Sequence, residues 1–165
     1  MAIWAIVPAA GVGKRMGTEI PKQYLSICGK TVLQHTLERL GRVRALSGVV
    51  LVLHPDDETP FPAGIPQSLP VRIARGGHER CHSVLNALKI LEPELASDGW
   101  VLVHDAARPC LRPSEVDRLI EAVGTHDVGG VLAAPVADTL KRANNAGEVA
   151  GCLLYTSDAA DEVLG

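Results

Sequence analysis

The chain has 165 residues, a formal net charge of −3 and aromatic side chains at 3% of its positions. This length suits one domain with enough chain to bury a core. A small negative charge and few aromatic rings argue against a nucleic-acid partner, which needs a basic surface and rings that stack on bases. No apolar run approaches membrane-spanning length, and the four cysteines show neither paired nor metal-like spacing, so we expect a cytoplasmic protein without a membrane partner.

Strands and helices are predicted to alternate along the chain. A continuous apolar run at 3–7 predicts a buried strand, and Thr31 can cap a helix that runs to about residue 44. A Pro-rich segment at 54–70 indicates a loop. Further strands are expected at 49–53, 71–74, 100–103 and 130–135, and further helices at 80–91 and 113–123. This alternation predicts an α/β fold with a mostly parallel, Rossmann-like sheet and helices on both faces.

Three loops follow strands of this sheet. They are the glycine loop after 3–7, the segment 75–77 and the segment 104–109. The carboxyl ends of parallel strands meet at one edge, and ligands bind beyond that edge. We therefore expect the three loops to form a single site.

The glycine loop carries G-x-G-x-R at 11–15 and is followed by P-K at 21–22. Met16 occupies the third glycine of a dinucleotide fingerprint, and Pro8 stands where a Walker A motif begins, so the loop fits neither pattern. Glycines let backbone N–H groups turn toward an anion. The loop therefore predicts a polyphosphate site, with a glycine-rich turn and surface cations as the alternative.

The chain resembles a known family. The loop motif is similar to the signature of sugar-phosphate nucleotidyltransferases. The resemblance narrows to the 2-C-methyl-D-erythritol 4-phosphate cytidylyltransferases through P-K-Q-Y-L at 21–25, G-G-x-x-R-x-x-S-V at 76–84 and V-H-D-A-A-R-P at 103–109. It implies a nucleotidyltransferase fold and transfer of a cytidylyl group from CTP to methylerythritol phosphate, with release of pyrophosphate, in isoprenoid precursor biosynthesis.

The resemblance also implies roles for single residues. Arg15 and Lys22 match the catalytic cations at the α-phosphate, where they would stabilise developing charge. His78 would contribute its backbone at most. The nucleotide-binding residues that the resemblance implies are Ala9, Ala10, Gly11, Gly13, Gly76, Gly77, His78, Ser83 and Ala106.

Substrate and metal binding are assigned to the segment after 100–103. The resemblance places Asp105 near the substrate and near Mg²⁺, or another divalent cation, bridging the phosphates. Arg108 is the candidate for the phosphate of the methylerythritol substrate. The alternative is that Asp105 and Arg108 form an ordinary surface ion pair.

A protruding β-arm is expected from about residue 136. In the family this arm crosses to a second subunit, so the resemblance implies a homodimer in which Thr139 serves the partner's pocket. The nucleotidyltransferase domain is expected at 1–150 and incomplete at its C-terminus. The tail 151–165 resembles translated sequencing-adapter DNA, and a genuine divergent end is the alternative. Because half a hairpin leaves backbone groups unpaired, we expect this polypeptide to be poorly active and prone to aggregate.

Two other functions stay open from the sequence. A ribitol-5-phosphate cytidylyltransferase shares the loop motif, but such enzymes tend to carry a bulkier residue where this chain has Ala107. A non-catalytic nucleotidyltransferase-like module is the other, although a pure binder has no need to retain Arg15, Lys22 and Asp105 together.

Overall fold

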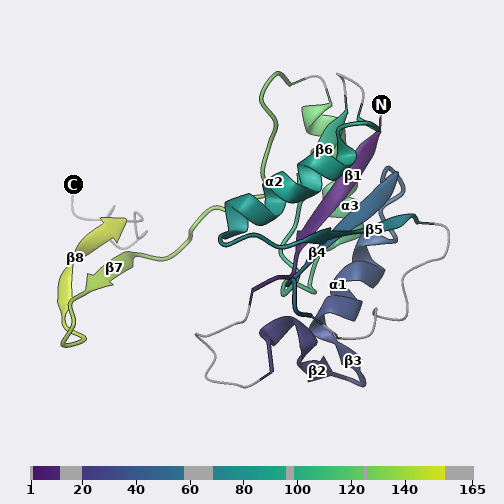
Figure 1. Cartoon of the computed structure of the whole chain (residues 1–165). Helices are drawn as coiled ribbons and strands as arrows, with labels where there is room; N and C mark the ends of the chain where they lie inside the picture. Colours follow the sequence, from purple (N-terminus) through teal and green to yellow (C-terminus); the bar gives the residue numbers. More distant parts are fainter. Residues whose placement is uncertain (1, 12–19, 58–68, 96–98, 125, 155–165) are drawn as a thin grey trace. The chain divides into compact units, whose positions relative to one another are not determined.

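The computed structural model describes residues 2–11, 20–57, 69–95, 99–124 and 126–154 (Figure 1). The chain forms two compact units, Met1–Gly130 and Val131–Gly165, which are considered separately. No helix among the described residues is both long and apolar enough to span a bilayer.

The first unit is built on a four-stranded parallel sheet in the order β5-β4-β1-β6. Its strands are β1 (Ile3–Pro8), β4 (Gly48–Leu53), β5 (Val71–Arg75) and β6 (Trp100–Val103). β1 pairs in parallel with both β4 and β6, and β4 pairs with β5. The four predicted strands between 3 and 103 are confirmed within one residue at each end.

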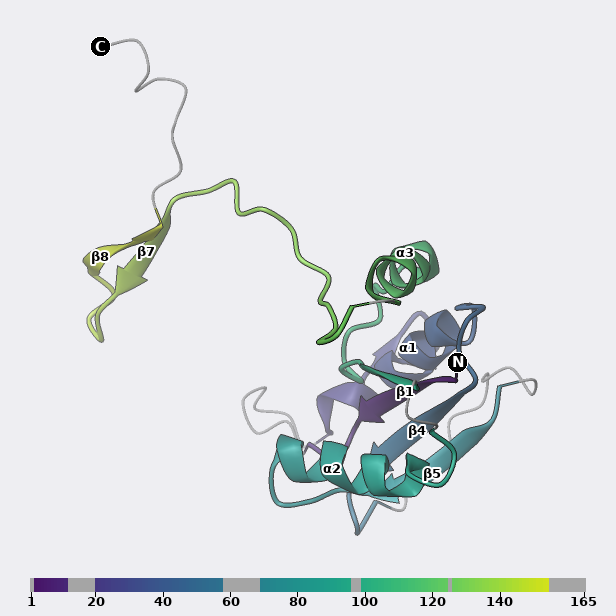
Figure 2. The same cartoon turned by 90° about the horizontal axis from the view of Figure 1, so that it is seen from above.

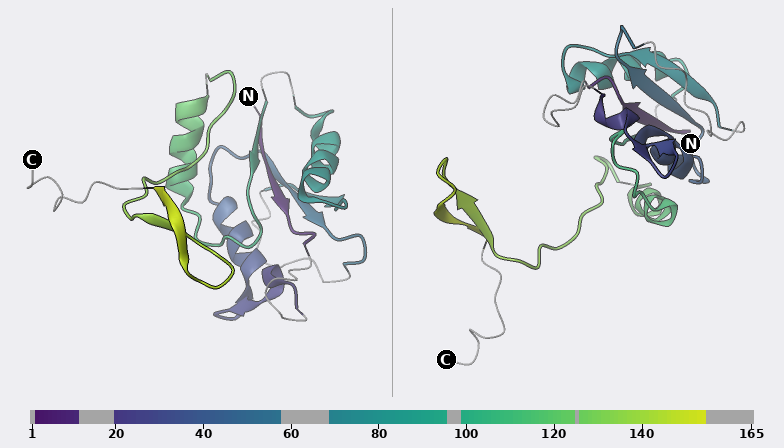
Figure 3. Two further views of the ribbon diagram at one scale, coloured as in Figure 1. Left: turned by 90° about the vertical axis from the view of Figure 1, so that its left-hand side faces the viewer. Right: turned by 90° about the horizontal axis from the view of Figure 1, so that it is seen from below.

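Helices cover both faces of the sheet, as predicted (Figures 2 and 3). α1 (Val32–Leu40) and α3 (Pro113–Val123) pack on the face that carries Ala5 and Val7 of β1. α2 (Arg80–Leu91) packs on the opposite face, against Trp4 and Ile6. Successive side chains of a strand point to opposite faces, so the continuous apolar run of β1 serves both layers of the core.

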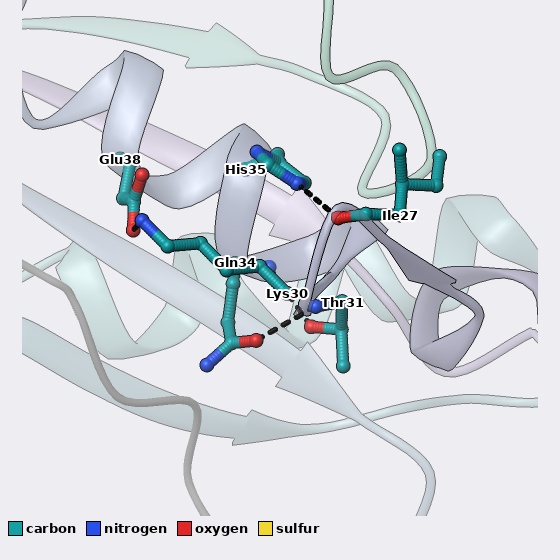
Figure 4. A network of polar contacts seen from close by, with 6 residues as sticks. All are labelled: Ile27, Lys30, Thr31, Gln34, His35 and Glu38. Carbon is teal, nitrogen blue, oxygen red and sulfur yellow. Dashed lines mark hydrogen bonds and ion pairs between the residues drawn. The ribbon is translucent and has the colours of Figure 1, made fainter.

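The start of α1 is fixed by a polar network with a small hairpin (Figure 4). Thr31 and Gln34 form a capping box, which confirms Thr31 as the N-cap. The His35 ring lies 2.8 Å from the carbonyl oxygen of Ile27, and Lys30 pairs with Glu38 at 2.6 Å. These contacts tie α1 to the strands that precede it.

That hairpin is absent from the sequence prediction. It consists of β2 (Ser26–Ile27) and β3 (Lys30–Thr31), preceded by the 3₁₀ helix η2 (Lys22–Tyr24). The turn residues Cys28 and Gly29 have φ of 49° and 78°, the conformation of a two-residue primed turn. A Cys-Gly turn lacks the Asn-Gly or Asp-Gly signal that usually reveals such hairpins.

Two other sequence predictions fail here. α1 ends at Leu40 with Gly41 as its C-cap, four residues short of the predicted end. The predicted strand at 130–135 is wrong, because this described segment pairs with no strand in the structure and Val131 is 82% exposed. An apolar run becomes a strand only where another strand satisfies its backbone groups.

The second unit contains an antiparallel hairpin of β7 (Leu140–Ala143) and β8 (Val149–Leu154). Asn144 closes its turn, since its side-chain oxygen accepts hydrogen bonds from the backbone of Ala146 and Glu148. The expectation of an arm with only an outgoing strand is therefore wrong. Residues 151–154 of the predicted tail complete the return strand, and 155–165 lie outside the described residues.

Candidate functional site

A cleft of about 460 Å³ lies at the carboxyl edge of the parallel sheet. It is lined by residues 8–11 at the end of β1, residues 77–80 after β5 and residues 105–108 after β6, together with Lys22 and Gln23 from η2. The prediction that the three loops share one site is confirmed, because all three contribute to this cleft.

The glycine loop is held by Gln23, which also lines the cleft. This side chain is 3% exposed, and its amide nitrogen donates to the carbonyl oxygens of Ala9 at 2.7 Å and Gly11 at 3.0 Å. Lys22, its neighbour on η2, is exposed and lines the cleft. Gly13 and Arg15 lie outside the described residues.

The backbone of the loop after β5 packs against the side chain of Ala10 in the glycine loop. A Cβ at Gly76 would lie 2.3 Å from the Cβ of Ala10, so the backbone at 76 fits there only without a side chain. Ser83 is buried, and its hydroxyl accepts from the Gly77 N–H at 3.0 Å and donates to the Glu79 carbonyl at 3.2 Å. The Ser83 hydroxyl thus shapes this loop, while its predicted contact with the nucleotide stays a prediction.

Asp105, in the loop after β6, forms ion pairs with two guanidinium groups. Its Oδ1 accepts from Nη2 of Arg80 at 2.8 Å, and its Oδ2 lies 2.9 Å from Nε of Arg108. The Arg80 hydrogen bond, more than any other contact, holds the pKa of the Asp105 carboxyl below its ordinary range, against the opposing effect of burial. The ion pair with Arg108 exists, but it lines the cleft and is not isolated on the surface.

We expect the pKa of Asp105 in Arg80→Gln to rise toward its ordinary value of 3.8, because the strongest hydrogen bond to the carboxylate is lost. A lowered pKa stabilises the folded protein above the unfolded value, and this stabilisation disappears as the pH falls through the folded pKa. The variant should therefore be less stable than the wild type near neutral pH and equal to it in strong acid.

Carboxyl ¹³C NMR titration of both proteins, with urea unfolding at each pH, measures this effect. Arg112→Gln is the matched control, because Arg112 pairs with Glu115 at 3.4 Å and does not line the cleft. An unchanged Asp105 titration in Arg80→Gln would show that the Arg80 contact is absent in solution.

The donor set at Asp105 fits Mg²⁺, the divalent cation that the resemblance implies. Mg²⁺ needs only one or two carboxylates when phosphate oxygens and water complete its shell. Each carboxylate oxygen of Asp105 has a further lone pair beyond its guanidinium contact. A cluster of Glu79, Cys81 and His82 also brings ligand atoms within 4.8 Å of one another, but sulfur and nitrogen donors do not suit this ion.

Thr139 belongs to the second unit, immediately before β7. Its predicted role in a substrate pocket therefore stays a prediction. Gln23 and Arg80 line the cleft and have no assigned role in the sequence analysis, although both lie inside its motifs.

The fold and the site define an α/β protein with a cleft at the carboxyl edge of its parallel sheet, lined by the cations Lys22, Arg80 and Arg108. The family model described as 2-C-methyl-D-erythritol 4-phosphate cytidylyltransferase matches residues 3–158, and the chain belongs to this family. The family resemblance drawn from the three motifs is thus confirmed.

Curated relatives with this description share about half of their residues with the chain. A Vibrio vulnificus protein is 50% identical over 140 residues, which cover 85% of this chain and 59% of the relative. A Chromohalobacter salexigens protein is 52% identical over 147 residues, covering 89% of this chain and 59% of the relative. The chain thus spans about three fifths of the length of these relatives.

Solved structures agree with the fold. A crystal structure of 4-diphosphocytidyl-2C-methyl-D-erythritol synthase matches with a TM-score of 0.74 at 40% identity, over 92% of this chain and 67% of that protein. A Francisella tularensis 2-C-methyl-D-erythritol 4-phosphate cytidylyltransferase matches with a TM-score of 0.73 at 30% identity, over 94% and 67% of the two chains.

Proposed function

We propose that this chain supplies the CTP site of an enzyme that transfers a cytidylyl group from CTP to 2-C-methyl-D-erythritol 4-phosphate. A phosphate oxygen of the substrate attacks the α-phosphorus, the bond to the bridging oxygen of the β-phosphate breaks, and pyrophosphate leaves with that electron pair. The convergence of Lys22, Arg80 and Arg108 on one cleft behind a glycine loop carries this proposal.

The residues of the cleft have separable tasks in this reaction. Backbone groups of 9–11 would bind the phosphates of CTP, and the loop at 77–79 would accept the cytosine ring. Lys22, with Arg15, would stabilise the charge that grows on the α-phosphate. Arg108 would hold the phosphate of the substrate in line for attack.

Asp105 would bind Mg²⁺ together with phosphate oxygens of the nucleotide. The ion would neutralise phosphate charge. Each oxygen of the Asp105 carboxylate keeps a lone pair beyond its guanidinium contact, which supports this assignment.

The hairpin β7–β8 is proposed as the arm of a homodimer, with Thr139 beside the partner's substrate. A two-stranded hairpin alone is only marginally stable in water. Val149 is 68% and Leu153 57% exposed on this hairpin, which supports a partner surface that covers them.

The free cysteines Cys28, Cys81, Cys110 and Cys152 support a reducing compartment, and we propose the cytoplasm.

Calorimetric titration of the chain with CTP, UTP and ATP in the presence of Mg²⁺ tests the nucleotide site. We expect CTP to bind at least tenfold more tightly than ATP, because a purine is too large for a site built for a pyrimidine, a difference of about 1.4 kcal/mol. Equal affinity for ATP, or no binding of CTP, would contradict the proposal. Turnover with methylerythritol phosphate compared with ribitol 5-phosphate then identifies the acceptor.

A further inference from the structure

Three polar side chains are buried among the residues that the structure describes, and each one binds the backbone of a different cleft loop. Gln23 binds the glycine loop, and Ser83 binds the loop at 77–79. Thr36 of α1 donates to the carbonyl oxygen of Ala106 at 2.8 Å. Burial of a polar group is costly unless it is hydrogen-bonded, and here each of the three side chains has a hydrogen bond to a wall of the cleft.

We propose that Gln23 is a positioning residue, which fixes the glycine loop and Lys22 in the geometry that receives the nucleotide phosphates. The inference rests on the proposed function, since the phosphates are those of CTP. It adds a role for a residue that does not itself need to touch the nucleotide.

The hydrogen bonds of Gln23 set the direction of the loop peptides. Both hydrogens of its amide nitrogen are used, one on the carbonyl of Ala9 and one on that of Gly11. The C=O of Ala9 and the N–H of Ala10 belong to one planar peptide and point in opposite directions. With the carbonyl held by Gln23, this N–H points away from the Gln23 side chain, at a residue that lines the cleft.

The Gln23 side chain also fixes the backbone position from which the Lys22 side chain extends. η2 is a single turn, closed by the Tyr24 N–H on the carbonyl of Pro21 at 2.8 Å. Such a short turn has little stability of its own. Because Gln23 is buried and bonded to residues 12 and 14 positions away, it anchors the turn and with it the backbone from which Lys22 extends.

A positioning role predicts more than a loss of stability. Gln23→Met keeps a side chain of similar length but removes both donors. We expect its CTP dissociation constant to rise about tenfold, the effect of one to two lost neutral hydrogen bonds. Val116→Ala is the matched control, because Val116 is buried on α3 outside the cleft. It should lower the melting temperature and leave CTP affinity unchanged.

NMR of the wild-type chain tests the proposal without any variant. We expect the side-chain amide protons of Gln23 to exchange slowly with solvent in the free protein and to shift when CTP is added. The amide of Asn86, which donates to the carbonyl of Arg75 at 3.0 Å and does not line the cleft, should exchange faster and stay unshifted.

The outcomes separate the two proposals. Tight CTP binding by Gln23→Met, or fast exchange of the Gln23 amide in the wild type, would overturn the positioning role. A wild-type chain that binds no CTP would overturn the proposed function, whatever the Gln23 amide does. Should Gln23→Met fail to fold, Gln23→Glu, which keeps the shape but has no donor when ionised, and the wild-type exchange measurement decide the question.

Discussion

In Lys22→Ala, turnover is expected to fall by about 10²–10³-fold, the loss typical when one preorganised contact to transition-state charge is removed. Lys22 is an exposed cation on the wall of the cleft, and it reaches the α-phosphate in the proposed mechanism. The charge it stabilises grows during transfer, so the CTP dissociation constant should change only a few-fold. Pyrophosphate release under saturating CTP measures the first effect and calorimetry the second.

This measurement uses a hybrid protein, because the chain spans 59% of the Vibrio vulnificus relative. The remaining part of that relative is joined after residue 154, where β8 ends. Lys30→Ala is the control, since Lys30 pairs with Glu38 and does not line the cleft. Near-normal turnover in Lys22→Ala would refute its catalytic role, and a loss of CTP binding would make it a ground-state binding residue. The chain without this extension is expected to be poorly active.

The sheet was predictable from local pattern alone. A buried parallel strand must be apolar throughout, so 3–7, 49–53 and 100–103 are recognisable without any knowledge of their neighbours. The segment 130–135 has the same appearance and forms no strand here, because strand formation depends on a partner that a local pattern does not reveal. The prediction of strands is thus limited by the pairing between strands, which the local sequence does not show, and not by their composition.

The loops that form the walls of the cleft could be predicted from the order of strands and helices along the chain. The hydrogen bonds between side chains and backbone within the cleft could not. Gln23 acts on carbonyl groups 12 and 14 residues away, and Arg80 acts on a carboxylate 25 residues away. Nothing in the local sequence indicates such contacts, since a buried glutamine and a surface glutamine look alike. Motif spacing could place Arg80 near the site, whereas its hydrogen bond to Asp105 requires the folded chain.

Gly76→Ala is expected to destabilise the first unit by about 1–3 kcal/mol, the usual cost of forcing an extra methyl group into a packed region. The new Cβ would lie 2.3 Å from the Cβ of Ala10 and 3.0 Å from the carbonyl oxygen of Leu53. The two loops must then separate, which widens the cleft and weakens CTP binding. Urea unfolding and calorimetry measure the two effects. In Gly11→Ala, where a Cβ would have no neighbour within 4 Å, stability should change by at most about 0.5 kcal/mol.

The steric origin of this effect can be tested by moving the methyl group across the contact. Ala10→Gly removes the atom that the new Cβ of Gly76→Ala would meet first. The double variant should therefore regain stability and CTP affinity relative to Gly76→Ala, with a coupling of about 0.5–3 kcal/mol between the two sites. Recovery should be partial, because the contact with Leu53 remains. Strictly additive losses would mean that the loops do not touch at this point, and that Gly76 is needed for another reason.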